Sequence, residues 1–155
     1  MREERGLKLD LARATRAWAP ARSRMARWAA AALGRRGEGR EIAVRVVAAR
    51  ESQALNKLWR GKDKPTNVLS FPAPKQRVPH DLAQPLGDLV ICAQVVRKEA
   101  EEHGKPIEAH WAHMIVHGSL HLAGYDHEQG LRERLRMERR EISVLKRFWI
   151  GNPYL

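Results

Sequence analysis

Residues 86–122 read L-G-D-L-V-I-C-A-Q-V-V-R-K-E-A-E-E-H-G-K-P-I-E-A-H-W-A-H-M-I-V-H-G-S-L-H-L. The apolar start of this stretch predicts a strand over 86–92, and the charged segment that follows predicts a helix over 93–103. A Gly-Lys-Pro sequence then ends that helix and opens a second, apolar helix over 107–122. A strand that leads into two successive helices indicates a core that both kinds of element share.

Working outward, the same patterns predict further elements on both sides of this stretch. Strands are expected over 6–12, 41–48 and 66–71, and helices over 21–33, 51–60 and 130–148. With early strands and late helices, we expect an α+β fold. The whole chain, 1–155, is expected to form a single domain, with a small mixed sheet of about four strands and about five helices. The Pro-rich segment 72–85 is expected to be a mobile loop.

The chain is strongly basic, with a net charge of +11, and residues 1–40 carry eleven Lys or Arg against four Asp or Glu. This excess favours a polyanionic partner, RNA or DNA first, or an anionic membrane surface. The expected helix over 21–33 has Met25, Trp28, Ala29 and Ala32 on one face, with arginines among and beside them. Those arginines indicate either RNA contact or an ordinary solvated face.

Cys92 is the only cysteine, so no internal disulfide can form, and its apolar neighbours indicate a buried thiol. The sequence has no apolar run near the roughly 18 residues that span a bilayer, and no signal-peptide pattern at its start. We therefore expect a cytoplasmic protein that does not enter the membrane.

The most informative motif is H-G-S-L-H-L-A-G-Y-D-H at 117–127. His117 and His121 are four residues apart, which places both rings on one face of a helix. Gly124 lets the chain leave the helix and fold back, so that His127 can return as a third metal ligand. Three histidines leave a fourth position open for water, as in catalytic zinc sites. We predict one Zn²⁺ ion per chain at this helix end, with Ni²⁺ or another divalent metal as alternatives.

A different register is also open, because His113 precedes His117 by four residues. Three ligands along one straight helix would spread over about 12 Å, which disfavours a site made of His113, His117 and His121. His113 is then expected to support the site or belong to the core. In metzincin proteases the first histidine is followed by a catalytic glutamate, whereas this chain has Gly118 there, which disfavours proteolysis.

The chain resembles the YbeY family of bacterial endoribonucleases. Three stretches carry the resemblance: L-N-K-L-W-R-G-K-D-K-P-T-N-V-L-S-F-P at 55–72, L-G-D-L-V-I-C at 86–92, and the histidine motif at 117–127. It is close over about 40–130 and looser outside that range.

The resemblance implies an α+β fold with metal ligands His117, His121 and His127, and catalytic roles for Arg60, His117 and His121. It also implies a single-strand-specific, metal-dependent endoribonuclease that acts in 16S rRNA 3′-end maturation and ribosome quality control. The implied partners are the 16S rRNA precursor and the 30S subunit, with ribosomal proteins or an assembly GTPase. Many members carry Asp where this chain has Asn67.

The residues alone fit such chemistry, because the Arg60 guanidinium offers a bidentate fork for phosphate. Arg60 could equally be an exposed turn residue. Asp126 could orient a histidine ligand or simply form a turn, and Ser70 and Asp88 are left without a role. Two other functions remain open: an RNA-binding assembly factor whose metal serves stability, and a metal hydrolase of another substrate.

Overall fold

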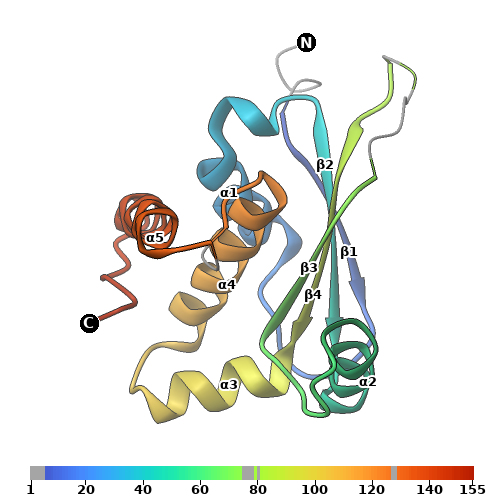
Figure 1. Ribbon diagram of the computed structural model, residues 1–155, viewed down its shortest axis with the longest axis vertical. Helices are drawn as coiled ribbons and strands as arrows, with labels where there is room; N and C mark the ends of the chain where they lie inside the picture. The colour runs from blue at the N-terminus through green and yellow to red at the C-terminus, as the bar shows by residue number, and fades with distance from the viewer. Residues whose placement is uncertain (1–5, 75–78, 80, 127–128) are drawn as a thin grey trace.

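The computed structural model of the chain describes residues 6–74, 79, 81–126 and 129–155 (Figure 1). Within these residues the elements follow one another in the order β1 (Lys8–Arg13), α1 (Arg22–Leu33), the short 3-10 helix η2 (Gly34–Gly37), β2 (Arg40–Val47), α2 (Ala49–Arg60), β3 (Val68–Pro72), β4 (Gln84–Cys92), α3 (Ala93–Glu102), α4 (Ile107–Leu122) and α5 (Leu131–Lys146). The predicted α+β class, with its four-stranded sheet and five α-helices, is confirmed for the described part of the chain.

The sheet is mixed and has the strand order β1-β2-β4-β3. β1 pairs in parallel with β2, and β2 with β4, whereas β3 pairs antiparallel with β4. Parallel neighbours need long crossover connections, and α1 lies in the crossover between β1 and β2. Figure 1 shows α1 and α4 against one face of this sheet, with α5 in an outer layer beyond them. Among the described helices, α2 covers one end of the opposite face (Figure 1).

Successive side chains of β4 are buried on opposite faces of the sheet. Leu89 and Ile91 are fully buried on the helix-covered side, in the main core. Val90 and Cys92 belong to a second, smaller buried cluster. Since successive side chains of a strand point to opposite faces, one strand serves two cores. The prediction that Cys92 is a buried thiol is confirmed.

Helix α4 crosses the middle of the domain. Its apolar side chains surround it, and Trp111, Ile115 and Leu120 are essentially inaccessible to solvent. A helix that is hydrophobic on most sides must be buried, and α4 packs against strands β3 and β4 and against the helices α1, α3 and α5. His117 and His121 therefore lie on a helix that packs against both the sheet and other helices.

The expected loop over 72–85 is shorter than predicted, because both flanking strands extend into it. β3 includes Pro72, and β4 starts at Gln84, whose backbone N–H donates to the carbonyl of Gly39. Pro85 lies beside a break in the β2–β4 register, where a proline without an N–H is tolerated. Residues 75–78 and 80 lie outside the described residues, so the predicted mobility of this loop stays a prediction.

The predicted apolar face of α1 is confirmed, since Met25, Trp28, Ala29 and Ala32 are all buried. Its arginines make contacts within the fold: Arg24 forms an ion pair with Glu108 of α4, and Arg22 donates to the carbonyl of Leu9. Among the described helices, none has both the length and the apolar character that crossing a bilayer requires.

Candidate metal centre

His117 and His121 lie one turn apart near the C-terminal end of α4. Their ring centroids are 4.8 Å apart and the ring planes are nearly perpendicular, at 79°. Both residues are half-buried, and their neighbours Val116, Gly118, Leu120 and Leu122 are buried. The predicted placement of the two rings side by side on one helical face is therefore confirmed.

The chain leaves helix α4 at Gly124, as the sequence predicted. α4 ends at Leu122, and Gly124 has a φ of +98°, a backbone conformation that side-chain-bearing residues rarely adopt. The N–H of Tyr125 donates to the carbonyl of Leu120, which closes the turn. His127, the third predicted ligand, lies outside the described residues, so its role stays a prediction.

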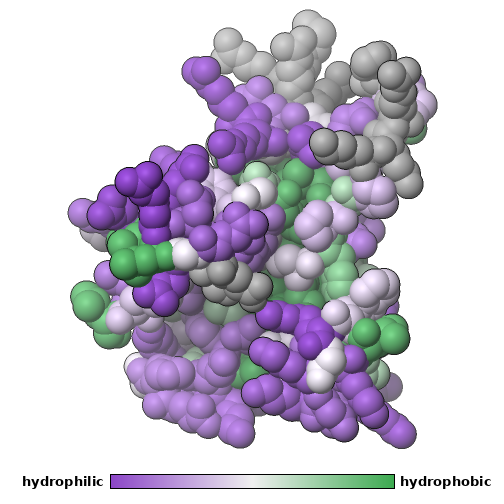
Figure 2. All heavy atoms as spheres, in the orientation of Figure 1, coloured by the Kyte–Doolittle hydropathy of each residue, from purple (hydrophilic) through white to green (hydrophobic). Residues whose placement is uncertain are grey.

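An open pocket of about 640 Å³ brings the histidine pair together with residues of three other segments. These segments are the end of α2, strand β3 with the residues before it, and the turn after α4. The lining includes Arg60, Asn67, Ser70, His117, His121, Tyr125 and Asp126. In Figure 2, pale and green residues form a strip between the purple, hydrophilic surface over α5 and the surface over the strands. Arg60, predicted as a catalytic residue, therefore shares one pocket with both histidines.

Two buried polar side chains hold Arg60 and β3 in this arrangement. The Ser52 hydroxyl accepts from the N–H of Thr66 and donates to its carbonyl, both at 2.9 Å. Asn56 Nδ2 donates to the carbonyl of Lys64 at 2.8 Å. Both side chains belong to α2 and are 2% exposed, so they tie the segment before β3 back onto the helix that ends at Arg60. Our sequence analysis missed them, although two polar residues on the inner face of an amphipathic helix were the available signal.

Behind the histidines lies a carboxylate that the sequence analysis also missed. Glu141 of α5 is fully buried, and its Oε1 accepts a hydrogen bond from His117 Nδ1 at 2.5 Å. Its other oxygen accepts from the hydroxyl of Tyr154. Burial works to raise the pKa of Glu141, but the imidazoles of His113 and His117 outweigh it and lower the pKa to about 2. Glu141 is therefore a buried carboxylate anion.

His113, His117 and Glu141 form a cluster that could hold a metal ion, since one ligand atom from each lies within 4.8 Å of the others. The distances within the cluster favour hydrogen bonding. Two ligands at about 2.0–2.1 Å from one tetrahedral ion lie about 3.3 Å apart. The 2.5 Å between Glu141 and His117 is shorter than that and fits a charge-assisted hydrogen bond.

The hydrogen bond between His117 and Glu141 is of the kind that supports a metal-binding histidine. A ring that carries its proton on Nδ1 has its lone pair on Nε2, and metal-binding histidines commonly donate their other N–H to a carboxylate. The pair His117 and His121 therefore fits a divalent cation on the pocket side, and imidazole nitrogens suit zinc or nickel.

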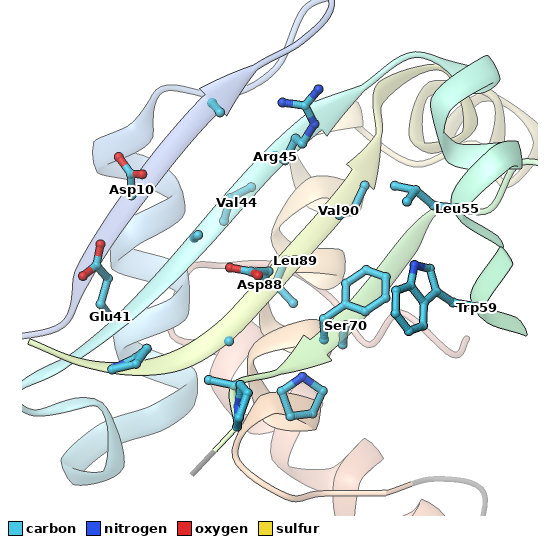
Figure 3. A pocket seen from close by; sticks show the side chains of 18 of the residues that line it. Asp10, Glu41, Val44, Arg45, Leu55, Trp59, Ser70, Asp88, Leu89 and Val90 are labelled. Atoms are coloured by element: carbon cyan, nitrogen blue, oxygen red, sulfur yellow. The ribbon is translucent and has the colours of Figure 1, made fainter. Parts of the chain in front are cut away.

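The remaining candidates fall into three places. Asp126 and Ser70 line the pocket, while His113 packs behind it, with Nε2 at 3.5 Å from Glu141. Asn67 donates to Glu99 at 3.0 Å and caps the N–H of Val68, so it anchors the start of β3. Asp88 lies instead in an adjoining groove of about 1060 Å³ on the open sheet face, with Asp10 and Glu41 (Figure 3), and Ser70 lines this groove as well.

The fold and the pocket define a class: a one-domain α+β protein with a candidate metal centre in an open cleft beside an arginine. Comparison with known proteins is consistent with this class. The family model described as Endoribonuclease YbeY matches residues 13–149. The chain belongs to the YbeY family.

Two relatives, each named Endoribonuclease YbeY, match nearly end to end. The protein from Methylococcus capsulatus is 50% identical over 149 residues, covering 96% of this chain and 95% of the relative. The protein from Halorhodospira halophila is 48% identical, covering 96% of both. The solution structure of TM1509 from Thermotoga maritima aligns with a TM-score of 0.61 over 91% of this chain and 89% of its own. At 24% identity that structure supports the fold alone.

Proposed function

We propose that this chain is a metal-dependent endoribonuclease, a hydrolase that cuts phosphodiester bonds in single-stranded RNA. The observation that carries the proposal is the pocket in which Arg60, His117 and His121 meet, in a chain of the YbeY family. The basic surface supports the same substrate, since a net charge of +11 favours a polyanion. The assembly-factor and other-hydrolase alternatives are not favoured.

His117, His121 and His127 would hold one divalent cation, zinc first and nickel next. A bound cation would supply Lewis-acid stabilisation for the negative charge that develops on the phosphate. The Arg60 guanidinium would bind the phosphate by two N–H donors and orient it toward the histidine pair. Glu141 would hold His117 from behind.

Beside Arg60, the indole of Trp59 is 65% exposed and lies edge-on to Phe71 at 5.8 Å between ring centroids. Exposed aromatic rings bind single-stranded nucleic acid by stacking on unpaired bases. Trp59 therefore favours an unpaired substrate, whose bases are accessible to such a ring.

We further propose, from the family resemblance, that the substrate is the 16S rRNA precursor on the 30S subunit and that the chain acts in the cytoplasm. Ribosomal proteins or an assembly GTPase would be its partners. Co-sedimentation of the chain with purified 30S subunits would test this part, and absence from the 30S fractions at low salt would contradict it.

The central experiment compares purified wild type with His117→Ala and Arg60→Glu on a defined 16S precursor RNA, with bound metal measured in parallel. We expect wild type to cut, His117→Ala to lose metal and activity, and Arg60→Glu to keep metal but lose most activity. Arg50→Glu, which reverses an exposed charge on the same helix, is the matched control. A folded, metal-bound wild type that cuts no RNA, even within ribosomal particles, would overturn the proposal.

A further inference from the structure

The segment that follows α5 returns to the histidine cluster. Tyr154 lies edge-on to the His113 ring, with centroids 5.4 Å apart and planes at 83°. Its hydroxyl donates to the buried Glu141 carboxylate. Lys105 Nζ donates to the carbonyl of Pro153, and the N–H of Tyr154 donates to Asn152 Oδ1 at 2.9 Å. These contacts attach residues 152–154 to α4 and α5 directly behind the metal centre.

The hydrogen bonds of Glu141 leave it little freedom to turn. Oε1 accepts from His117, Oε2 accepts from Tyr154, and the side chain is 0% exposed, so the protein rather than water satisfies this anion. An unpartnered buried carboxylate is costly, so each donor helps to keep the charge in place. A fixed carboxylate at Nδ1 holds the His117 proton there and leaves the lone pair of the ring on Nε2.

We infer that Glu141 and Tyr154 are positioning residues of the metal centre, acting in series through His117. Glu141 selects the Nδ1–H tautomer of His117 and so leaves the Nε2 lone pair for the metal, and Tyr154 fixes the carboxylate that does so. The affinity for metal therefore depends on a side chain beyond α5, 37 positions after the ligand it supports. The inference rests on the metal centre of the proposed function.

Three variants separate this role from a purely structural one. Tyr154→Phe removes one hydroxyl and leaves the ring packed on His113. Glu141→Gln keeps the size of the side chain but removes its charge. Glu133→Gln removes a carboxylate from the same helix without contact to His117 and is the matched control. Thermal unfolding shows which variants fold, and Tyr154→Phe keeps the inference testable if Glu141→Gln does not.

The first readout uses metal-free protein and histidine ¹⁵N NMR. We expect His117 to be protonated on Nδ1 in wild type and in Glu133→Gln, and this preference to weaken in Tyr154→Phe and Glu141→Gln. A His117 protonated mainly on Nε2 in folded, metal-free wild type would overturn the inference. This readout needs no bound metal, so it is independent of the proposed activity.

The second readout is the dissociation constant for Zn²⁺, measured by competition with a chromogenic chelator. Loss of such a supporting partner typically costs about 10- to 100-fold in affinity, and we expect that loss in Glu141→Gln. Tyr154→Phe should lose less, in the same direction, and Glu133→Gln should match wild type. Wild-type affinity in both test variants would overturn the inference, whereas a wild type that binds no Zn²⁺ would overturn the metal centre itself.

Discussion

Oε1 of Glu141 lies 2.5 Å from Nδ1 of His117, although the two residues are 24 positions apart and belong to different helices. This hydrogen bond joins the outer helix α5 to the histidine helix α4. It also places the only fully buried carboxylate of the described residues behind the candidate metal centre. The packing of α5 is thus coupled directly to the position of the His117 ring.

Substitution of either of two closely packed glycines by alanine should destabilise the protein, whereas substitution of a glycine with open space around it should not. A Cβ on Gly87, whose φ is +151°, would lie 2.5 Å from the Phe71 carbonyl oxygen and 2.6 Å from Leu122 Cδ2. We expect Gly87→Ala to lower the free energy of unfolding by about 2–5 kcal/mol, from steric overlap and backbone strain. A Cβ on Gly118 would lie 2.7 Å from Cδ2 of Leu89, a side chain that is fully buried in the main core.

For Gly118→Ala we expect a net loss of about 1 kcal/mol, because the gain in helix propensity offsets part of the overlap. Urea denaturation would measure both variants. Gly151→Ala, with no atom within 4 Å of the added Cβ, is the control and should match wild type. Equal stability of all three variants would contradict the close approach of Gly87 to Phe71 and of Gly118 to Leu89.

Removal of one imidazole should empty the metal centre. His121→Ala should reduce bound metal well below one ion per chain, because two ligands hold a divalent cation poorly. His103→Ala removes an exposed histidine of the segment after α3 and is the control. Elemental analysis after dialysis measures the stoichiometry. Unchanged metal content in His121→Ala would refute the ligand assignment.

A chelator should lower the melting temperature of wild type, because an ion that binds only the native state stabilises it. The stabilisation is about 2.7 kcal/mol at a metal concentration of 100 times the dissociation constant. His121→Ala should be insensitive to the chelator. An identical shift in both proteins would place the stabilising ion elsewhere.

Glu99 should contribute stability that depends on pH. Burial works to raise its pKa, but hydrogen bonds from His110 and Asn67 outweigh burial and hold the pKa of Glu99 below its usual value of 4.5. A group whose pKa is lowered by folding stabilises the native state above its unfolded pKa, and loses that effect as pH falls through the folded pKa. Wild type should therefore exceed Glu99→Gln in stability near neutral pH, and the difference should shrink below about pH 4.5.

Denaturation of both proteins across this pH range measures the effect. Glu101→Gln, an exposed carboxylate of the same helix, should show no such dependence beyond that of wild type. A constant difference between wild type and Glu99→Gln at all pH values would contradict the expectation.

Two arginines beside the pocket should contact RNA. The guanidinium carbons of Arg36 and Arg136 lie 5.4 Å and 5.2 Å from the centroid of the Tyr125 ring, and Tyr125 lines the pocket. Neither has an ion pair to a carboxylate among the described residues, so each places an uncompensated positive charge against the ring of a pocket residue. Each substitution to Gln should weaken binding and reduce the salt slope of log K by about 0.7, the value for one single-strand phosphate contact.

The control is Arg134→Gln, which removes the same charge two residues away on α5, where the side chain faces a different side and approaches Glu138. Binding of a short single-stranded RNA would be titrated at several salt concentrations, with metal removed to prevent cleavage. Equal salt slopes of log K for Arg136→Gln and Arg134→Gln would mean that Arg136 contributes only to the net charge of the protein and makes no phosphate contact of its own.

Local patterns were sufficient for the elements of this fold and for part of its site. The apolar run before Cys92, the breaker at Gly104 and the i, i+4 spacing of His117 and His121 act within a few residues, so the sequence alone determined the strand, the helices and the adjacent rings. The turn at Gly124 was predictable for the same reason, since it depends on the freedom of one backbone position.

Only the tertiary structure decided the contacts that join distant segments. Glu141 and Tyr154 look like ordinary residues of an amphipathic helix and its following turn, and no local pattern shows that both reach His117. The role of Gly118 changed as well: its missing side chain admits Leu89 of β4, besides leaving no catalytic glutamate. Sequence spacing determines which side chains share a helix face, whereas packing determines which buried charge lies behind them, because that depends on how separate elements meet in the core.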